Sequence, residues 1–364
     1  MSASPSAASP APRVDLSGFF RFIPLSLVRF TLPSSPMKKL SLLAAALAAL
    51  ALPLSSFGQA AAAPAAPKTL TIGVVAKSES NAVFQAARRG AEAAAADFSK
   101  KLNMTIKIDW RTPNDEDAQK QAENIEQLVL SGANGIAVSC SDANKVTDAI
   151  NRAVSNGVPV VTFDSDAPQS KRFAIYGTDD VTCGTQIMDE LGKEMGGKGV
   201  VAILAGNQNA PNLQTRAKAV RDEAAKKFPD IKILDTYYHK ETPQDAAAKV
   251  EQVMLANPQI TGWAMIGGWP LFTANALKWK PGTVKCVAVD ALRPELAYIE
   301  DGHVNLLLAQ QCYQWGYQSV TLLVDKIVNH KQPDKAFVPS PLIPVTKDNL
   351  EEYRKQLDVW MPKS

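Results

Sequence analysis

Residues 69–84 read Thr69-Leu-Thr-Ile-Gly-Val-Val-Ala-Lys-Ser-Glu-Ser-Asn-Ala-Val-Phe84 and continue into an alanine-rich segment. The pattern is typical of an apolar strand, a short polar turn and an amphipathic helix. Parallel sheets built from such units gather their polar turns at the carboxyl ends of the strands, where ligands bind. We therefore predict a ligand site at this first turn.

The same unit recurs in a first series that ends near residue 177. Its strands are expected at residues 70–76, 106–110, 135–139, 158–163 and 173–176, with helices between them. In the second helix, apolar residues recur every three or four positions from Ala118 to Val129, and we expect Asp115 to begin this helix and Gly132 to end it. The strands are continuously apolar, as a parallel sheet covered on both faces requires.

A second series follows Asp180. Its strands are expected at residues 200–204, 231–237, 263–266, 284–289 and 304–309, and its helices include 180–195, 213–228 and 243–255. A last long helix at 313–329 precedes a proline-rich tail, which we expect to cross between the two halves before a short helix at 348–357. Two successive series predict an α/β protein with two doubly wound parallel-sheet lobes.

The first 63 residues read as a leader. Residues 37–63 begin with Met37-Lys-Lys39, continue as an apolar run and end in small residues, which are the three regions of a secretory signal peptide. A membrane anchor is the alternative, but the run is shorter than the ~20 residues that a spanning helix needs. We expect a cleaved signal and a periplasmic protein, and we interpret residues 1–36 as a mis-annotated extension before the true start at Met37.

The charge balance argues against nucleic acid as a partner. The chain has 39 basic and 36 acidic residues, but residues 1–67 hold five of the basic and one of the acidic residues, which leaves 34 and 35 in the remainder. A near-neutral body has no electrostatic footprint for nucleic acid.

Cysteine and histidine usage argues against a metal site. The four cysteines, at positions 140, 183, 286 and 312, form no Cys-x-x-Cys pair, and the chain has three histidines. We expect no metal and no cofactor. If two cysteines pair in an exported protein, Cys286 and Cys312 are the expected couple; the alternative is four small buried hydrophobic residues.

Aspartates follow two of the expected strands. Asp164 and Asp166 follow Val160-Val-Thr-Phe163, and Asp290 follows Val287-Ala-Val289. A carboxylate can accept charge-assisted hydrogen bonds from two adjacent sugar hydroxyls, and such bonds are about twice as strong as neutral ones. We interpret these aspartates as ligand-binding, and the alternative is that they cap the following helices.

Other polar and aromatic residues stand in strand-end turns. In the first turn, Asn81 can bond a hydroxyl and Phe84 can pack on the apolar face of a sugar ring, whereas a helix cap and a core residue are the alternatives. Further candidates, with a solvated loop as the alternative for the first three, are Asn209, Gln214, Arg216 and Trp269.

Motifs that would indicate an enzyme are missing from the sequence. It has no Gly-x-Ser-x-Gly elbow, no phosphate loop and no Gly-x-Gly-x-x-Gly after the first strand. Asp164 and Asp290 could in principle hydrolyse a glycoside as a pair of acids, but binding alone explains both. We predict that the protein is not an enzyme and has no catalytic residues.

Taken together, these residues resemble the periplasmic sugar-binding proteins of the ribose-binding type, over roughly residues 69–346. The marks of the resemblance are Ile72-Gly-Val-Val75 with Asn81, Phe84 and Gly90, then Gly135-Ile-Ala-Val138, Gly157-Val-Pro-Val-Val-Thr-Phe-Asp164, Gly177-Thr-Asp-Asp180, Val289-Asp290 and Ala309-Gln-Gln-Cys-Tyr-Gln-Trp-Gly316.

The resemblance implies a monomeric substrate-binding protein that delivers a sugar or polyol to an ABC permease of the inner membrane. It implies a type I periplasmic binding fold with a three-crossover hinge near Thr178, Gln310 and Pro339. The expected lobes are residues 69–177 plus 311–339 and residues 178–310 plus 340–364. By resemblance, the residues that contact the sugar are Asn81, Phe84, Asp164, Asp290 and Gln310.

The sequence also departs from the ribose pattern. Four positions differ, with Ser165 in place of an arginine, Val83 in place of an aromatic residue, Gln214 near an expected arginine and a glycine at 267 or 268 in place of an asparagine. With Asp166, Glu79 and Trp269 as compensating residues, these changes suit a different sugar, a polyol or a ligand carrying positive charge. A sensor subunit that presents its ligand to a chemoreceptor or membrane kinase would share the same lobes; a glycoside-processing enzyme is a weaker alternative, and a transcriptional regulator would need a DNA-binding segment where this chain has an export signal.

Overall fold

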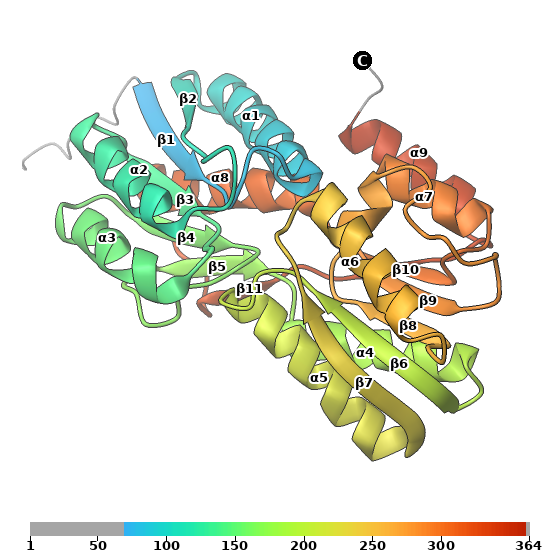
Figure 1. The fold of residues 1–364 in the computed structure, drawn as a ribbon. Coiled ribbons are helices and arrows are strands. Elements are labelled where there is room, and N and C mark those ends of the chain that lie inside the picture. The colour runs from blue at the N-terminus through green and yellow to red at the C-terminus, as the bar shows by residue number, and fades with distance from the viewer. Residues whose placement is uncertain (1–68, 362–364) are drawn as a thin grey trace, which may run out of the picture. The chain divides into compact units, whose positions relative to one another are not determined.

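The structure, a computed structural model, describes residues 69–361, so the predicted signal peptide and amino-terminal extension lie outside the described residues. Two six-stranded sheets form the framework, and each carries helices on both faces (Figure 1). Within this described part, no helix combines the length and apolar character needed to cross a bilayer.

The first sheet is parallel throughout and has the order β11-β5-β4-β3-β1-β2. Its strands are β1 (Thr69–Val75), β2 (Thr105–Trp110), β3 (Gly135–Val138), β4 (Val160–Phe163), β5 (Ala174–Gly177) and β11 (Phe337–Pro339). One face is covered by α1 (Ala82–Leu102) and α8 (Cys312–Val328), and the other by α2 (Ala118–Leu130) and α3 (Ala143–Ser155) (Figure 1). Strands β3, β4 and β5 are buried along their whole length, which is why they read as continuous apolar runs.

The second sheet has the order β12-β10-β9-β8-β6-β7, with β12 antiparallel to β10 and the other pairs parallel. Its strands are β6 (Lys198–Ala205), β7 (Asp230–Tyr238), β8 (Gly262–Met265), β9 (Lys285–Val289), β10 (Leu306–Ala309) and β12 (Ile343–Val345). One face packs against α4 (Asp180–Glu194) and α5 (Pro211–Lys227). The other packs against α6 (Pro243–Ala256), the 3-10 helix η1 (Trp269–Phe272), α7 (Arg293–Glu300) and α9 (Leu350–Trp360).

The two sheets have equivalent strand orders, apart from the reversed direction of β12. Strands β1, β3, β4 and β5 of the first correspond to β6, β8, β9 and β10 of the second, and β11 and β12 occupy matching edges. The predicted fold of two parallel-sheet α/β lobes is confirmed. The equivalence also places the ends of β4 and β9 at matching positions in the two lobes.

The chain passes between the lobes three times, after β5, after β10 and between β11 and β12. The passages are hydrogen-bonded to one another. The Ser340 amide donates to the Gly177 carbonyl at 2.8 Å, and the Gln311 side-chain amide donates to the Pro341 carbonyl at 3.1 Å. These contacts join the three passages into one hinge region, as the family resemblance implies. The exact boundaries of the two lobes remain predictions.

Helices α1 and α8 approach each other closely at two glycines. A Cβ atom added to Gly316 would lie 1.8 Å from the Ala87 carbonyl oxygen, and one added to Gly90 would lie 1.9 Å from the Tyr313 carbonyl oxygen. Only glycine allows the two backbones to pack at this distance.

The ends of α2 show how well local signals predicted helix boundaries. The helix is capped by Asp117, whose side chain accepts a hydrogen bond from the Lys120 amide, so the prediction of Asp115 is wrong by two residues. Asp115 and Asp117 are both aspartates, so either has the chemistry of a cap. Gly132 ends the helix as predicted, with a left-handed φ of 81°.

The four cysteines are all buried and free. The Cys286–Cys312 pair, expected only if two cysteines pair, is therefore not formed, and the alternative of four small buried hydrophobic residues holds.

Candidate ligand-binding site

The carboxyl ends of both sheets meet around a small cavity of about 20 Å³, here called the inner cavity. It is lined by residues of both lobes: Lys77, Asn81, Val83, Phe84, Asp164, Asn212, Leu213, Arg216, Glu241, Gly267, Trp269, Asp290, Gln310 and Trp315. A cavity of this volume holds about one water molecule. Seven of the ten residues predicted for the site line it.

Asp164 and Asp290 extend from the matching ends of β4 and β9 into this cavity. Both have a left-handed backbone, with φ of 57° and 78°, and both are 6% exposed. A non-glycine residue in this region is strained by about 1–3 kcal/mol, and such strain concentrates at functional sites. The shared cavity is what the prediction of a two-sided site requires, although the binding role of these residues stays a prediction.

Neither aspartate caps a helix. The strand β5 follows Asp164, and α7, the first helix after Asp290, has Leu292 at its cap position. The helix-cap alternative for these two residues is therefore wrong, and their side chains are available to the cavity.

The Asp164 carboxylate joins the two lobes. It accepts a hydrogen bond from the Ser139 hydroxyl at 2.7 Å, within its own lobe, and one from the Asn212 amide of the second lobe at 3.1 Å. Asp290 accepts from the Gln310 amide at 2.8 Å. Burial raises the pKa of the Asp290 carboxyl above its ordinary value, and the Gln310 hydrogen bond opposes this shift.

Arg216 and Gln310 connect the cavity to the hinge region. The Arg216 guanidinium donates to Asp180 at 2.7 Å, to the Gln310 side-chain oxygen at 2.7 Å and to the Ile266 carbonyl at 3.2 Å. Gln310 also accepts from the Thr178 hydroxyl at 3.1 Å. Burial raises the pKa of Asp180 to about 6 although Arg216 opposes the shift. Two predicted site residues are thus members of a buried network that reaches two hinge passages.

Aromatic side chains form the apolar part of the cavity wall. Phe84 is 2% exposed, and its ring centroid lies 6.2 Å from that of Trp315. Trp269 contacts His239 edge-on at a centroid distance of 4.9 Å. Asn81 caps α1 through the Val83 amide and also lines the cavity. Asn81 is therefore a helix cap and Phe84 a core residue, as the alternatives predict. Both residues also line the cavity, as a binding role would require.

Three predicted site residues lie away from the inner cavity. Asp166 is held by two hydrogen bonds from Arg172, and Gln214 is exposed and donates to the Gln208 carbonyl. Asn209 is exposed and lines a separate pocket. The structure therefore does not bring these three to the cavity, because local polar partners or solvent take up their side chains.

Sequence reasoning missed Lys77, Glu241 and Asn212. The Lys77 side chain is 2% exposed, and its Nζ lies 3.8 Å from Asp164 Oδ2 and 3.9 Å from Glu241 Oε1. Burial alone would lower the pKa of the ammonium, but Glu241 and Asp164 outweigh this effect and raise the pKa. The only signal in the sequence is the position of Lys77, directly after an apolar strand, where lysine is otherwise exposed.

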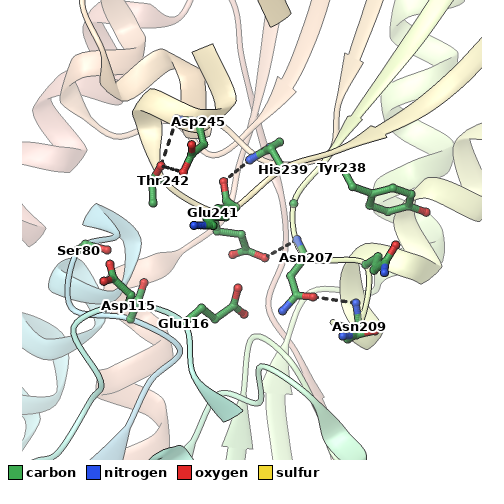
Figure 2. Close-up of a pocket in the computed structure, with 14 residues that line it drawn as sticks. Ser80, Asp115, Glu116, Asn207, Asn209, Tyr238, His239, Glu241, Thr242 and Asp245 are labelled. Carbon is green, nitrogen blue, oxygen red and sulfur yellow. Dashed lines mark hydrogen bonds between the residues drawn. The ribbon is translucent and has the colours of Figure 1, made fainter. Parts of the chain in front are cut away.

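A larger outer pocket of about 680 Å³ opens beside Glu241, and no other residue of the inner cavity lines it. Figure 2 shows Asp115 and Glu116 of the first lobe across from Glu241 and Asn207 of the second. Burial raises the pKa of Glu116 to about 7, and the neighbouring Glu241 carboxylate contributes to this shift to a smaller extent. Among residues 69–361, no group of three or more acidic, histidine or cysteine side chains is arranged to hold a metal ion.

Residues 72–331 match the periplasmic binding protein domain family, and the chain belongs to this family. The family and the fold predicted from the sequence are confirmed. The ribose import binding protein RbsB of Bacillus subtilis is 24% identical over 276 residues, which cover 76% of this chain and 87% of that protein. The xylitol-binding protein of Mycolicibacterium smegmatis is 28% identical over 202 residues, 54% of this chain and 57% of that protein. The crystal structure of an ABC transporter solute-binding protein from Burkholderia graminis in complex with D-arabinose is similar with a TM-score of 0.72 and 27% identity, covering 78% of this chain and 97% of that one.

Proposed function

We propose that this protein captures a small sugar or polyol between its two lobes and delivers it to an ABC importer. The observation that carries the proposal is the pair Asp164 and Asp290, which reach one cavity from equivalent strand ends of opposite lobes. Aromatic walls and paired acids suit the apolar faces and the hydroxyl groups of such a ligand. Relatives named for ribose import and for xylitol binding, and a similar solute-binding protein solved in complex with D-arabinose, support this class of ligand.

Capture would work through the hinge region. The inner cavity of about 20 Å³ is smaller than any monosaccharide, so the lobes must part for entry. A ligand shifts the balance toward closed lobes only by its greater affinity for the closed form. Residues from both lobes supply that difference, as in other periplasmic binding proteins, which close by hinge motion.

Several finer points belong to the same proposal. The protein is exported to the periplasm, acts as a monomer, docks on a permease in the inner membrane and returns its ligand chemically unchanged. The compact site built from binding groups, with Arg216 and Asp290 already hydrogen-bonded to neighbours, supports binding rather than turnover.

Thermal-shift screening of the purified full chain against pentoses, hexoses and their polyols tests the proposal. A ligand with a dissociation constant of about 1 μM, present at 100 μM, adds about 2.7 kcal/mol to the free energy of unfolding and raises Tm by several degrees. Recovery of the sugar unchanged after long incubation separates a binder from an enzyme. If no sugar or polyol in the panel raises Tm or gives heat in titration calorimetry, the proposed function is wrong.

A further inference from the structure

The Lys77 ammonium has hydrogen-bonding capacity that no described residue uses. Its two nearest carboxylate oxygens, on Asp164 and Glu241, are at 3.8 and 3.9 Å, both beyond the 3.5 Å limit of a hydrogen bond. An ammonium group carries three N–H donors and no acceptor. The side chain is 98% buried and lines the inner cavity, so these donors face the space between the lobes.

Lys77 also places a positive charge between two carboxylates of the cavity. It stands between one carboxylate of its own lobe and one of the opposite lobe, which is the position that the cationic group of a charged ligand would otherwise take. The other buried cation, Arg216, is occupied by Asp180, Gln310 and the Ile266 carbonyl. The two acids that flank this position, Asp164 and Glu241, therefore already have a cation between them.

We infer that Lys77 is a specificity-determining residue that donates hydrogen bonds to a ligand hydroxyl and excludes ligands bearing an ammonium group. A hydroxyl suits the position because it accepts from Lys77 while it donates to Asp164 or Glu241. An ammonium cannot accept, and it would have to displace Lys77 from between the two acids. The inference rests on the proposed function and narrows its ligand class to hydroxyl-bearing molecules without positive charge at this position.

The experiment compares matched probes by titration calorimetry with the full chain. The probes are galactose with galactosamine, glucose with glucosamine, and sorbitol with 1-amino-1-deoxysorbitol. We expect wild type to bind the best hydroxyl compound at least tenfold more tightly than its amino partner. In Lys77→Met, the hydroxyl compound should lose at least tenfold in affinity, and the ratio between the two probes should shrink at least tenfold or reverse, because the ligand ammonium then replaces the missing one.

Two further variants separate specificity from folding. Lys218→Met makes the same change at an exposed lysine of α5 and should leave the probe ratio within threefold of wild type. Glu241→Gln removes one of the two acids without removing Lys77, so it should increase the discrimination against amino compounds and should improve binding of the matching sugar acids, galacturonate and glucuronate. It keeps the inference testable if Lys77→Met does not fold.

The outcomes are distinct. Equal losses for the hydroxyl and amino probes in Lys77→Met would assign Lys77 a purely structural role and overturn the inference while the proposed function stands. If Lys77→Met does not fold, an unchanged probe ratio in Glu241→Gln overturns it in the same way. If wild type binds none of the probes and none of the wider sugar and polyol panel, the proposed function falls and the inference falls with it.

Discussion

Replacing Asp164 by asparagine is the most direct test of the site. Asparagine keeps the size of the side chain and tolerates the left-handed backbone at this position, where φ is 57°. The substitution removes the negative charge that accepts from Ser139 at 2.7 Å and from Asn212 at 3.1 Å. The test therefore isolates charge-assisted hydrogen bonding from changes in shape or backbone strain.

The magnitude follows from the two kinds of hydrogen bond. A bond to a charged group contributes about 1.5–3 kcal/mol and a neutral one about 0.5–1.5 kcal/mol, so each bond weakens by about 1 kcal/mol. For two ligand hydroxyls on one carboxylate, the loss is about 2 kcal/mol. At 1.4 kcal/mol for each factor of ten, the dissociation constant should rise about 30-fold.

Titration calorimetry with the best ligand of the panel provides the measurement. Asp166→Asn is the matched control, because it makes the same chemical change two residues further along, where Arg172 holds the side chain away from the inner cavity. We expect the control to bind within threefold of wild type. Equal affinities for Asp164→Asn and wild type, or equal losses in the two variants, would refute the reasoning.

Three further predictions concern stability. Arg216→Met should lower the free energy of unfolding by about 3 kcal/mol in urea denaturation, because it leaves the partly buried Asp180 carboxylate without its partner. Gly316→Ala should lower it by about 1–3 kcal/mol or more, measured in the same way, because its Cβ would lie 1.8 Å from the Ala87 carbonyl oxygen. Glu116→Gln should be more stable than wild type by roughly 1–3 kcal/mol at pH 8 and equally stable near pH 4.5, because the pKa of Glu116 in the folded protein, about 7, exceeds the ordinary 4.5. Measuring Tm of both proteins across this pH range provides the test.

The sign of the pH effect follows from proton binding. Between pH 4.5 and 7, the folded protein keeps a proton on Glu116 that the unfolded chain has lost, so this group's contribution to stability falls as pH rises through that window. A pH-independent difference between the variant and wild type would contradict this account. For the arginine variant, the double change Arg216→Met with Asp180→Asn should recover part of the loss, and full additivity of the two single changes would argue against a coupled pair.

The sequence predicts the fold well because each structural unit is locally encoded. An apolar strand such as β1, the polar turn after it and the alanine-rich helix α1 all lie within 34 residues, and the burial of both sheet faces gives the strands their continuous apolar pattern. The elements that escaped prediction are all short: η1 and α7 have four and eight residues, and the edge strands β11 and β12, in the tail predicted only to be extended, have three each. Helices this short have too few turns to show a periodic stripe.

The site was predictable only where a residue type carries its own signal. Asp164 and Asp290 follow buried strands and were found from that pattern alone, whereas Lys77 and Glu241 acquire their importance from each other across the two lobes. A pairing between residues so far apart in the sequence leaves no local pattern. Asp166 and Gln214 were predicted at the site but do not line the inner cavity, because nearby partners, Arg172 and the Gln208 carbonyl, hold their side chains away from it.

The burial of the cysteines has a practical consequence. All four sulfhydryl groups are shielded, and burial raises their pKa, so they react slowly with maleimides. Val181, which is 58% exposed on the rim between the lobes near the first hinge passage, offers a place for a single dye through Val181→Cys. Such a labelled protein would report ligand capture as a change in fluorescence, with the native sequence otherwise intact.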